Sequence, residues 1–181
     1  MKGIILLANY FEDVEALITI DILRRAKIQI DLVSMEKSLE VKTQSNIKII
    51  ADKLVSEISL SNYDFLIIPG GKAVFNTHLE SSVTKNILDY FYNKNLLVAS
   101  ICAAPMVLGK YGYLEGKNFV CFPSCEEEIK NAILNSDKRV VVDSNIITSK
   151  AAGTTFDFAY EIVKYLKGKE EADKVLNSVY Y

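Results

Sequence analysis

The 181-residue sequence is poor in histidine and cysteine, has little net charge and contains no long apolar run. A formal net charge of −2 provides no basic surface, which argues against nucleic acid as a partner. No apolar run approaches the roughly 20 residues of a membrane span, and residues 1–8 are too short and wrongly flanked for a signal peptide. The odd count of three cysteines favours free thiols in a reducing compartment. We therefore expect a cytoplasmic protein with neither a membrane nor a nucleic-acid partner.

What the sequence does contain is an alternation of apolar runs and helix-period segments along the whole chain. Strands that alternate with helices predict a mainly parallel sheet covered on both faces, so the expected class is α/β. No linker, repeat or low-complexity segment is visible, which predicts a single domain over residues 1–181. The predicted strands are residues 3–8, 28–34, 65–68, 96–101, 119–122, 140–143 and 146–148, with a short hairpin or excursion at 41–42 and 47–51. The predicted helices are residues 12–27, 80–93, 125–134, 155–167 and 169–179.

Cys102 stands where an apolar run of strand type meets small residues and then a helix-like run. This arrangement is typical of a nucleophile elbow, in which the side chain is held on a tight strand-to-helix turn. The free N–H groups and the dipole of the following helix favour the thiolate over the thiol. The alternative is a buried cysteine that only fills the core. The elbow setting favours a reactive thiol.

Three segments with chemistry-bearing or flexible residues follow directly after predicted strands. Asn9 follows residues 3–8, Pro69-Gly70-Gly71 follows residues 65–68, and Cys102 follows residues 96–101. Parallel sheets bind ligands at the carboxyl ends of their strands, so we expect these segments to form one site. The glycine pair lacks the Lys-Ser/Thr of a phosphate loop, which leaves close backbone approach as its role.

These motifs together make the chain resemble the DJ-1/PfpI superfamily, and within it the DJ-1/ThiJ/YajL branch. The resemblance rests on the elbow Ala-Ser-Ile-Cys-Ala-Ala-Pro, on Pro-Gly-Gly, on the segment 9–15 and on the closing segment 147–158. It covers nearly the whole chain. It implies a flavodoxin-like three-layer sandwich, a homodimer and no cofactor. It also implies reactive carbonyls or peroxide as the small molecules that meet the site.

The resemblance also implies roles for particular residues. Cys102 matches the oxidation-sensitive nucleophile of the family, and Glu15 matches the glutamate that hydrogen-bonds its sulfur. Gly71 and Ala103 match the residues whose backbone N–H groups face the oxygens of an oxidised sulfur or a substrate oxyanion. The family activities are cofactor-free conversion of glyoxals to hydroxy acids, protein deglycation, redox sensing and chaperone-like holding.

Glu15 and Cys102 are expected to titrate as one pair that shares a proton. A charged Glu15 would raise the pKa of the thiol, whereas a protonated Glu15 would donate to the thiolate and lower that pKa. We hypothesise that burial keeps Glu15 partly neutral and that Cys102 is partly thiolate at neutral pH. The alternative is that Glu15 is only a solvated acid in the first turn of a helix.

The sequence departs from the family at two histidine positions. Phe122 takes the place of a histidine found near the cysteine in the human-type branch, and Ala103 takes the place of the histidine that follows the cysteine in the protease branch. A Cys-His dyad is therefore absent unless His78, the single histidine, reaches the site. A surface or capping role for His78 is the expected one, and peptidase activity is disfavoured.

Four further positions bear on the surroundings of Cys102 or on the expected dimer. Lys150 replaces a family arginine and so keeps the charge but loses two-pronged recognition, and Asn46 replaces an arginine near the dimer and pocket entrance. Cys121 and Cys125 have a poor spacing for zinc. Cys121 is expected in the core, and Cys125 is a candidate resolving thiol for oxidised Cys102.

The leading hypothesis is a glyoxalase- or deglycase-type enzyme that protects against reactive carbonyls and oxidative stress, with Cys102 and Glu15 as catalytic residues. Gly71 and Ala103 would supply oxyanion N–H groups, and no metal is expected. The alternative is a non-enzymatic redox sensor or holdase that uses the same cysteine without turnover.

Overall fold

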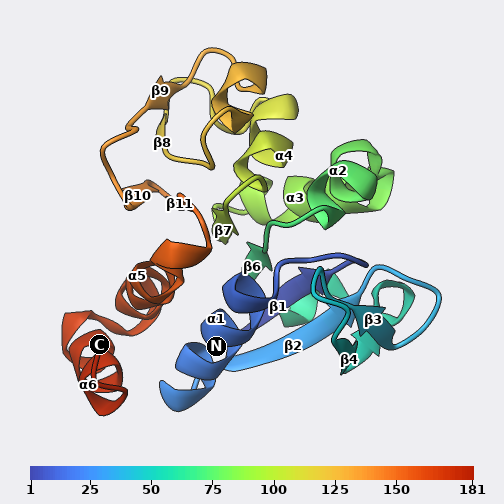
Figure 1. Ribbon diagram of the computed structural model, residues 1–181, viewed down its shortest axis with the longest axis horizontal. Coiled ribbons are helices and arrows are strands. Elements are labelled where there is room, and N and C mark those ends of the chain that lie inside the picture. Colours follow the sequence, from blue (N-terminus) through green and yellow to red (C-terminus); the bar gives the residue numbers. More distant parts are fainter.

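The computed structural model describes residues 1–181 and is built around a seven-stranded sheet (Figure 1). Its strands follow the spatial order β10-β11-β7-β6-β1-β2-β5, and each of them is parallel to its neighbours except β10, which pairs antiparallel with β11. The strand bounds are β1 Lys2–Leu7, β2 Gln29–Ser34, β5 Lys53–Leu54, β6 Phe65–Ile68, β7 Leu97–Ile101, β10 Val140–Asp143 and β11 Ile146–Ser149. The predicted mainly parallel α/β architecture is confirmed.

The order of the five inner parallel strands is that of a flavodoxin-like fold. In chain order they are β1, β2, β6, β7 and β11, and β1 lies between β2 and β6 in the sheet. The chain first moves from β1 to β2 and then crosses back to the other side of β1. The topological switch point is thus between β1 and β6, and ligands of such sheets bind near that point at the carboxyl ends of the strands.

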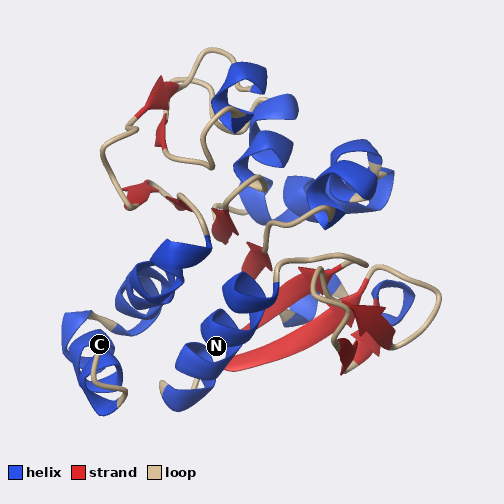
Figure 2. Ribbon diagram, viewed as in Figure 1, coloured by secondary structure: helices blue, strands red, loops and turns tan.

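Helices cover both faces of the sheet and make the three layers (Figures 1 and 2). One face carries α1 Asp13–Arg25, α5 Thr155–Lys167 and α6 Lys169–Ser178, which pack on one another. The other carries α2 Ala73–Asn76, α3 Ser82–Asn93 and α4 Pro105–Lys110. None of these helices combines the length and the apolar character that a membrane crossing requires.

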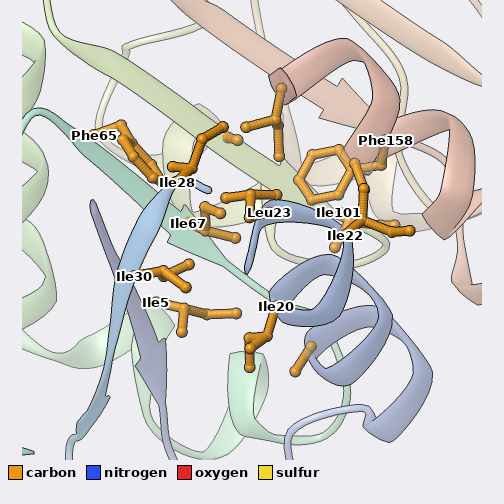
Figure 3. Packing of buried hydrophobic residues seen from close by; sticks show 14 of the residues in the cluster. Ile5, Ile20, Ile22, Leu23, Ile28, Ile30, Phe65, Ile67, Ile101 and Phe158 are labelled. Carbon is orange, nitrogen blue, oxygen red and sulfur yellow. The ribbon is translucent and has the colours of Figure 1, made fainter. Parts of the chain in front are cut away.

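The strands are buried on both sides, and successive side chains enter different halves of the core. Ile5 and Leu7 of β1 belong to the cluster beneath α1, α5 and α6, whereas Ile4 and Leu6 belong to the cluster beneath α3 and α4. This alternation follows from the two-residue repeat of a strand. Figure 3 shows the first cluster, in which Phe158 of α5 meets side chains from α1 and the sheet. A largely apolar run is therefore the sequence signature of β1, β6 and β7.

Two small sheets lie outside the central one. The predicted hairpin is present as β3 Glu40–Lys42 and β4 Lys48–Ile50, which pair antiparallel. Its backbone is tied to the segment after β1, because Tyr10 N donates to Lys42 O at 2.7 Å and Gln44 N donates to Phe11 O at 2.8 Å. The second sheet pairs β8 Asn118–Phe119 with β9 Ile133–Leu134.

The predicted helix over residues 125–134 is wrong. Only Cys125–Glu128 forms a short 3-10 turn, and the chain then runs into β9. Asn131 adopts a left-handed φ of 58°, which a continuing helix does not allow. The predicted strand over 119–122 is also shorter than expected, although Val120 N still reaches Thr148 Oγ1 of β11 at 3.0 Å.

Candidate functional site

The predicted site residues meet at the carboxyl ends of three neighbouring strands. Glu15 lies in the first turn of α1, which follows β1. Gly71 follows β6, and Cys102 with Ala103 follows β7. The strand order places β6 between β1 and β7, so the three connections come together next to the switch point. The structure thus brings Cys102, Glu15, Gly71 and Ala103 into one cluster.

Cys102 occupies a strained turn, as an elbow requires. Its φ of 65° lies in the left-handed region that few residues other than glycine adopt. Backbone hydrogen bonds hold this conformation on both sides, because Cys102 N donates to Ser149 O at 2.9 Å and Phe122 N donates to Cys102 O at 2.8 Å. The short helix α4 begins three residues later at Pro105. Strain of this kind persists where surrounding structure enforces it, and it collects at functional sites.

Glu15 is fully buried and is not the solvated helix acid of the alternative interpretation. Glu12 precedes α1 as its N-cap, and its carboxylate accepts the Glu15 N–H at 2.8 Å. The Glu15 side chain points the other way, and its Oε2 accepts the Gly70 N–H at 2.7 Å. The second oxygen, Oε1, is buried without a hydrogen-bond partner, and the carboxyl group lies close enough to the Cys102 thiol for each to shift the pKa of the other. The carboxyl group is therefore positioned to exchange a proton with the sulfur.

Close backbone approach at Gly70 and Gly71 makes this contact possible. A Cβ on Gly70 would lie 2.6 Å from the Cβ of Cys102 and 2.6 Å from Glu15 Oε2. Gly71 has a φ of +88°, and a Cβ there would lie 2.6 Å from Glu12 N. Neither position has room for a side chain. The sequence pattern predicted close approach for the glycine pair, but it did not reveal that Gly70 itself holds Glu15.

Burial dominates the ionisation of the pair. Burial raises the pKa of Glu15 from its ordinary 4.5 to about 7, and the charge of Glu12 adds to that increase. Burial also raises the pKa of the Cys102 thiol, and a charged Glu15 raises it further. Hydrogen bonds from the backbone N–H groups of Ala103 and Gly71 to the sulfur act in the opposite direction. The raised Cys102 pKa disagrees with the prediction that the sulfur is partly thiolate at neutral pH. Burial is the main cause and a charged Glu15 adds to it, so the proton on Glu15 controls only part of this shift.

A pocket of about 720 Å³ opens above the sulfur. Its exposed lining is mainly apolar, and two segments each contribute an exposed aromatic side chain: Phe75 from α2 and Phe122 from the segment after β8. Cys125 lines the same pocket, whereas Cys121 is buried in the core as expected. All three cysteines are free thiols. The pocket residues are Glu12, Glu15, Gln44, Gly71, Lys72, Phe75, Cys102, Ala103, Met106, Phe122, Pro123, Ser124, Cys125, Glu128, Ala151, Ala152 and Gly153.

His78 does not line this pocket, and of the surface or capping role predicted for it the surface position is wrong. Its side chain is fully buried, with Nδ1 at 3.1 Å from Thr84 Oγ1 in the first turn of α3. Burial lowers the pKa of His78 from 6.5 to about 4, so its ring is neutral at pH 7. The site therefore has no Cys-His dyad. No group of three or more His, Cys, Asp or Glu side chains is placed to hold a metal ion.

Lys150 and Asn46, the two residues expected to replace family arginines, do not line the pocket. Lys150 is not among the pocket residues, and its Nζ donates to Ser136 O at 2.8 Å. Asn46 forms the turn between β3 and β4 with a left-handed φ of 66°. Sequence reasoning missed Phe75, because a single aromatic residue in a short helix carries no signal of its own.

Fold and site together define a flavodoxin-like α/β protein with a cysteine on a nucleophile elbow and a buried glutamic acid beside it. A family model described as DJ-1/PfpI matches residues 1–165, and the chain belongs to the DJ-1/PfpI family. The sequence is similar to DJ-1beta of Drosophila melanogaster, with 34% identity over 175 residues that cover 96% of this chain and 94% of the relative. DJ-1alpha of the same fly is 36% identical over 180 residues, which cover 98% of this chain and 83% of the relative.

Solved structures agree with this assignment. The structure of Drosophila DJ-1beta matches with a TM-score of 0.93 and 33% identity, covering 98% of this chain and 96% of that one. The oxidised form of Toxoplasma gondii DJ-1 matches with a TM-score of 0.94 and 30% identity, covering 99% of this chain and 98% of that one. The predicted family and the flavodoxin-like fold are both confirmed.

Proposed function

We propose that this protein is a cofactor-free glyoxalase-type enzyme that converts 2-oxoaldehydes to 2-hydroxy acids at Cys102. The observation that carries the proposal is the buried Glu15 carboxyl group close to the Cys102 side chain, with both residues lining one open pocket. Membership of the DJ-1/PfpI family supports the same reading. A related deglycase action on glycated thiols or amines would use the same groups.

Hydrogen bonding favours a thiolate paired with a neutral Glu15 in the reactive state. A thiolate accepts from the N–H groups of Gly71 and Ala103 and from the Glu15 O–H. If the proton is on the sulfur instead, those N–H groups face a neutral and much weaker acceptor. Hydrogen bonds to a charged group contribute roughly 1.5–3 kcal/mol each. These donors reduce the cost of burying the thiolate.

The reaction uses one proton on Glu15 repeatedly. The thiolate adds to the aldehyde carbon, and the new alkoxide takes the Glu15 proton to give a hemithioacetal. The Glu15 carboxylate then removes the C–H proton from that carbon to give an enediolate. The hydroxyl proton passes to the neighbouring oxygen, and Glu15 returns the C–H proton to the neighbouring carbon, which leaves a thioester of the 2-hydroxy acid. The N–H groups of Gly71 and Ala103 stabilise the oxyanions. Water attack releases the acid and restores the thiol, so one water is consumed and no redox partner is needed.

The experiment is a methylglyoxal-to-lactate assay on the wild type and on Cys102→Ser. We expect steady turnover in the wild type and none in the variant. Cys121→Ser is the matched control, because Cys121 is buried outside the pocket. Turnover that survives in Cys102→Ser would overturn the proposal.

A second candidate function is peroxide sensing, favoured by the partial exposure of Cys102 and by the donors around it. Peroxide oxidises a thiolate to a sulfenic and then a sulfinic acid, and the same N–H groups would hold the sulfinate oxygens. A DJ-1 relative has been solved in an oxidised form. Peptide mass spectrometry after graded peroxide treatment tests this function. A selective gain of two oxygens on Cys102, without turnover of 2-oxoaldehydes, would favour the sensor over the enzyme.

The mass experiment also tests the resolving role of Cys125. Cys125 and Cys102 line one pocket, so a disulfide between them would appear as a loss of two hydrogens.

We further expect a homodimer, as the family resemblance implies. Light scattering should then give twice the 20.3 kDa of one chain.

A further inference from the structure

Two large apolar side chains that line the Cys102 pocket are exposed. Phe75 in α2 is 53% exposed, and Phe122 in the segment after β8 is 46% exposed. Both line the pocket together with Met106 of α4. Single exposed apolar residues are ordinary on a protein surface, but here two exposed aromatic side chains line the same reactive pocket. Exposure of apolar surface to water is unfavourable, and a bound apolar group would remove this surface from water.

The backbone holds Phe122 in place independently of its ring. Its N–H donates to Cys102 O at 2.8 Å, and its own carbonyl accepts the Cys125 N–H at 3.0 Å. These hydrogen bonds fix the position of the Phe122 backbone relative to Cys102. Phe75 lies in a helix that begins just after Gly71, one of the two N–H donors to the sulfur. Each aromatic residue thus belongs to a segment that also contacts Cys102: Phe122 through its hydrogen bond to Cys102 O, and Phe75 through the nearby Gly71.

The charges of the pocket disfavour an acidic substituent. Its wall carries the carboxyl groups of Glu12 and Glu128 in addition to Glu15, against the single amine of Lys72. The surface near Ala151, Ala152 and Gly153 is formed by small side chains, and no atom lies within 4 Å of the Cβ position of Gly153. The pocket therefore combines apolar side chains with open space on its 151–153 side, which suits an uncharged group.

We propose that Phe75 and Phe122 are specificity-determining residues that select 2-oxoaldehydes with an aromatic or bulky apolar substituent. This inference rests on the proposed function. The aldehyde end meets Cys102, and the substituent packs against the two rings. Removal of a well-packed apolar contact in a substrate pocket changes relative kcat/KM by about 10- to 200-fold. Aromatic pairs add to the effect of buried area through offset or edge-to-face packing.

The test compares phenylglyoxal with methylglyoxal as substrates of the wild type and of Phe75→Ala/Phe122→Ala. We expect the double variant to lose about tenfold or more of the kcat/KM for phenylglyoxal, with a change below about threefold for methylglyoxal. Both side chains are substantially exposed, so their loss leaves the core intact. The intrinsic reactivity of the two aldehydes cancels in this comparison because each is measured against itself.

Tyr165→Ala in α5 is the matched control, since Tyr165 is 44% exposed and does not line the pocket. An unchanged phenylglyoxal to methylglyoxal ratio in the double variant would overturn the inference while leaving the proposed function intact. Absence of Cys102-dependent turnover with either aldehyde would overturn the proposed function first. Equal losses with both substrates would show that the rings act on the site as a whole and not on the substituent, which also contradicts the inference.

Discussion

At the residue scale, the contact between the acid and the thiol depends on the absence of a side chain at Gly70. Gly70→Ala would place a carbon 2.6 Å from both Cys102 Cβ and Glu15 Oε2, so one of the two partners must move. A displacement of about 1 Å at a reacting group costs on the order of 100-fold in rate. We expect a loss of that size in turnover and a lower free energy of unfolding, by about 1–3 kcal/mol.

Gly153→Ala is the matched control for this prediction. Gly153 also lines the pocket, but no atom lies within 4 Å of its Cβ position. We expect turnover close to that of the wild type, and an unfolding free energy within about 0.5 kcal/mol. Equal behaviour of the two alanine variants would show that close approach at Gly70 is not required.

The shared proton of Glu15 and Cys102 leads to a second residue-scale prediction. Glu15→Gln keeps a donor beside the sulfur and removes the charge, so it should retain the thiolate. Glu15→Leu removes the donor, and the thiol pKa should rise by about one to two pH units relative to Glu15→Gln. The pH dependence of Cys102 alkylation by iodoacetamide measures this pKa. A thiol pKa in Glu15→Leu equal to that of the wild type would contradict the shared-proton arrangement.

At the element scale, the N-terminus of α1 links helix capping to the acidity of Glu15. Glu12 accepts the Glu15 N–H at 2.8 Å and, after burial, its charge is the next cause of the raised Glu15 pKa. Glu12→Gln keeps an acceptor oxygen but removes the charge, so the Glu15 pKa should fall while the helix stays capped. Glu12→Ala removes the cap as well and should destabilise the protein by about 1 kcal/mol.

Two measurements separate these effects. Carbon-13 NMR of the Glu15 carboxyl follows its titration, and urea unfolding follows the stability of each variant. The same Glu15 pKa in the wild type and in Glu12→Gln would rule out the electrostatic part. Equal stability of the glutamine and alanine variants would rule out the capping part.

The elements differ in how well the sequence predicts them. Strands buried on both faces were placed within one or two residues, because a continuous apolar run between turns has few other interpretations. The segment 125–134 was predicted as a helix, and its helix-like composition is overridden by a left-handed Asn131 and by pairing of β9 with β8. Pairing between distant segments and positive φ values at residues other than glycine leave little trace in local composition.

The candidate site shows the same division. Cys102, Glu15, Gly71 and Ala103 follow from motifs at strand ends, since the carboxyl ends of parallel strands meet. Gly70 as the donor to Glu15 and Phe75 as a pocket wall depend on three-dimensional approach and were not predicted. His78 was predicted near the surface because polar residues usually are, yet Thr84 provides a partner that allows it to be buried.

At the scale of the whole molecule, two buried titratable groups make opposite contributions to the pH dependence of stability. Glu15 has a raised pKa of about 7, so between pH 4.5 and 7 the native state holds a proton that the unfolded chain has released. Its contribution is therefore present at low pH and is lost as the pH rises through that window. His78 has a lowered pKa of about 4, so between pH 4 and 6.5 the unfolded chain binds a proton that the native state excludes. Its contribution makes stability rise with pH.

Each contribution amounts to about 3 kcal/mol over its window, and the two nearly cancel between pH 4.5 and 6.5. The wild type should accordingly show a nearly flat unfolding free energy there, since carboxylates with lowered pKa values such as Asp13 and Asp31 act below this range. Glu15→Gln removes the Glu15 contribution, which decreases as the pH rises. The unfolding free energy of this variant should therefore increase by about 3 kcal/mol from pH 4 to 6.5. His78→Asn keeps a polar group that can hydrogen-bond Thr84, and it removes the His78 contribution, which increases as the pH rises. The unfolding free energy of this variant should therefore decrease by a similar amount from pH 4.5 to 7. Urea unfolding at half-unit pH steps measures all three slopes, and parallel curves for the wild type and both variants would show that neither buried group is linked to folding.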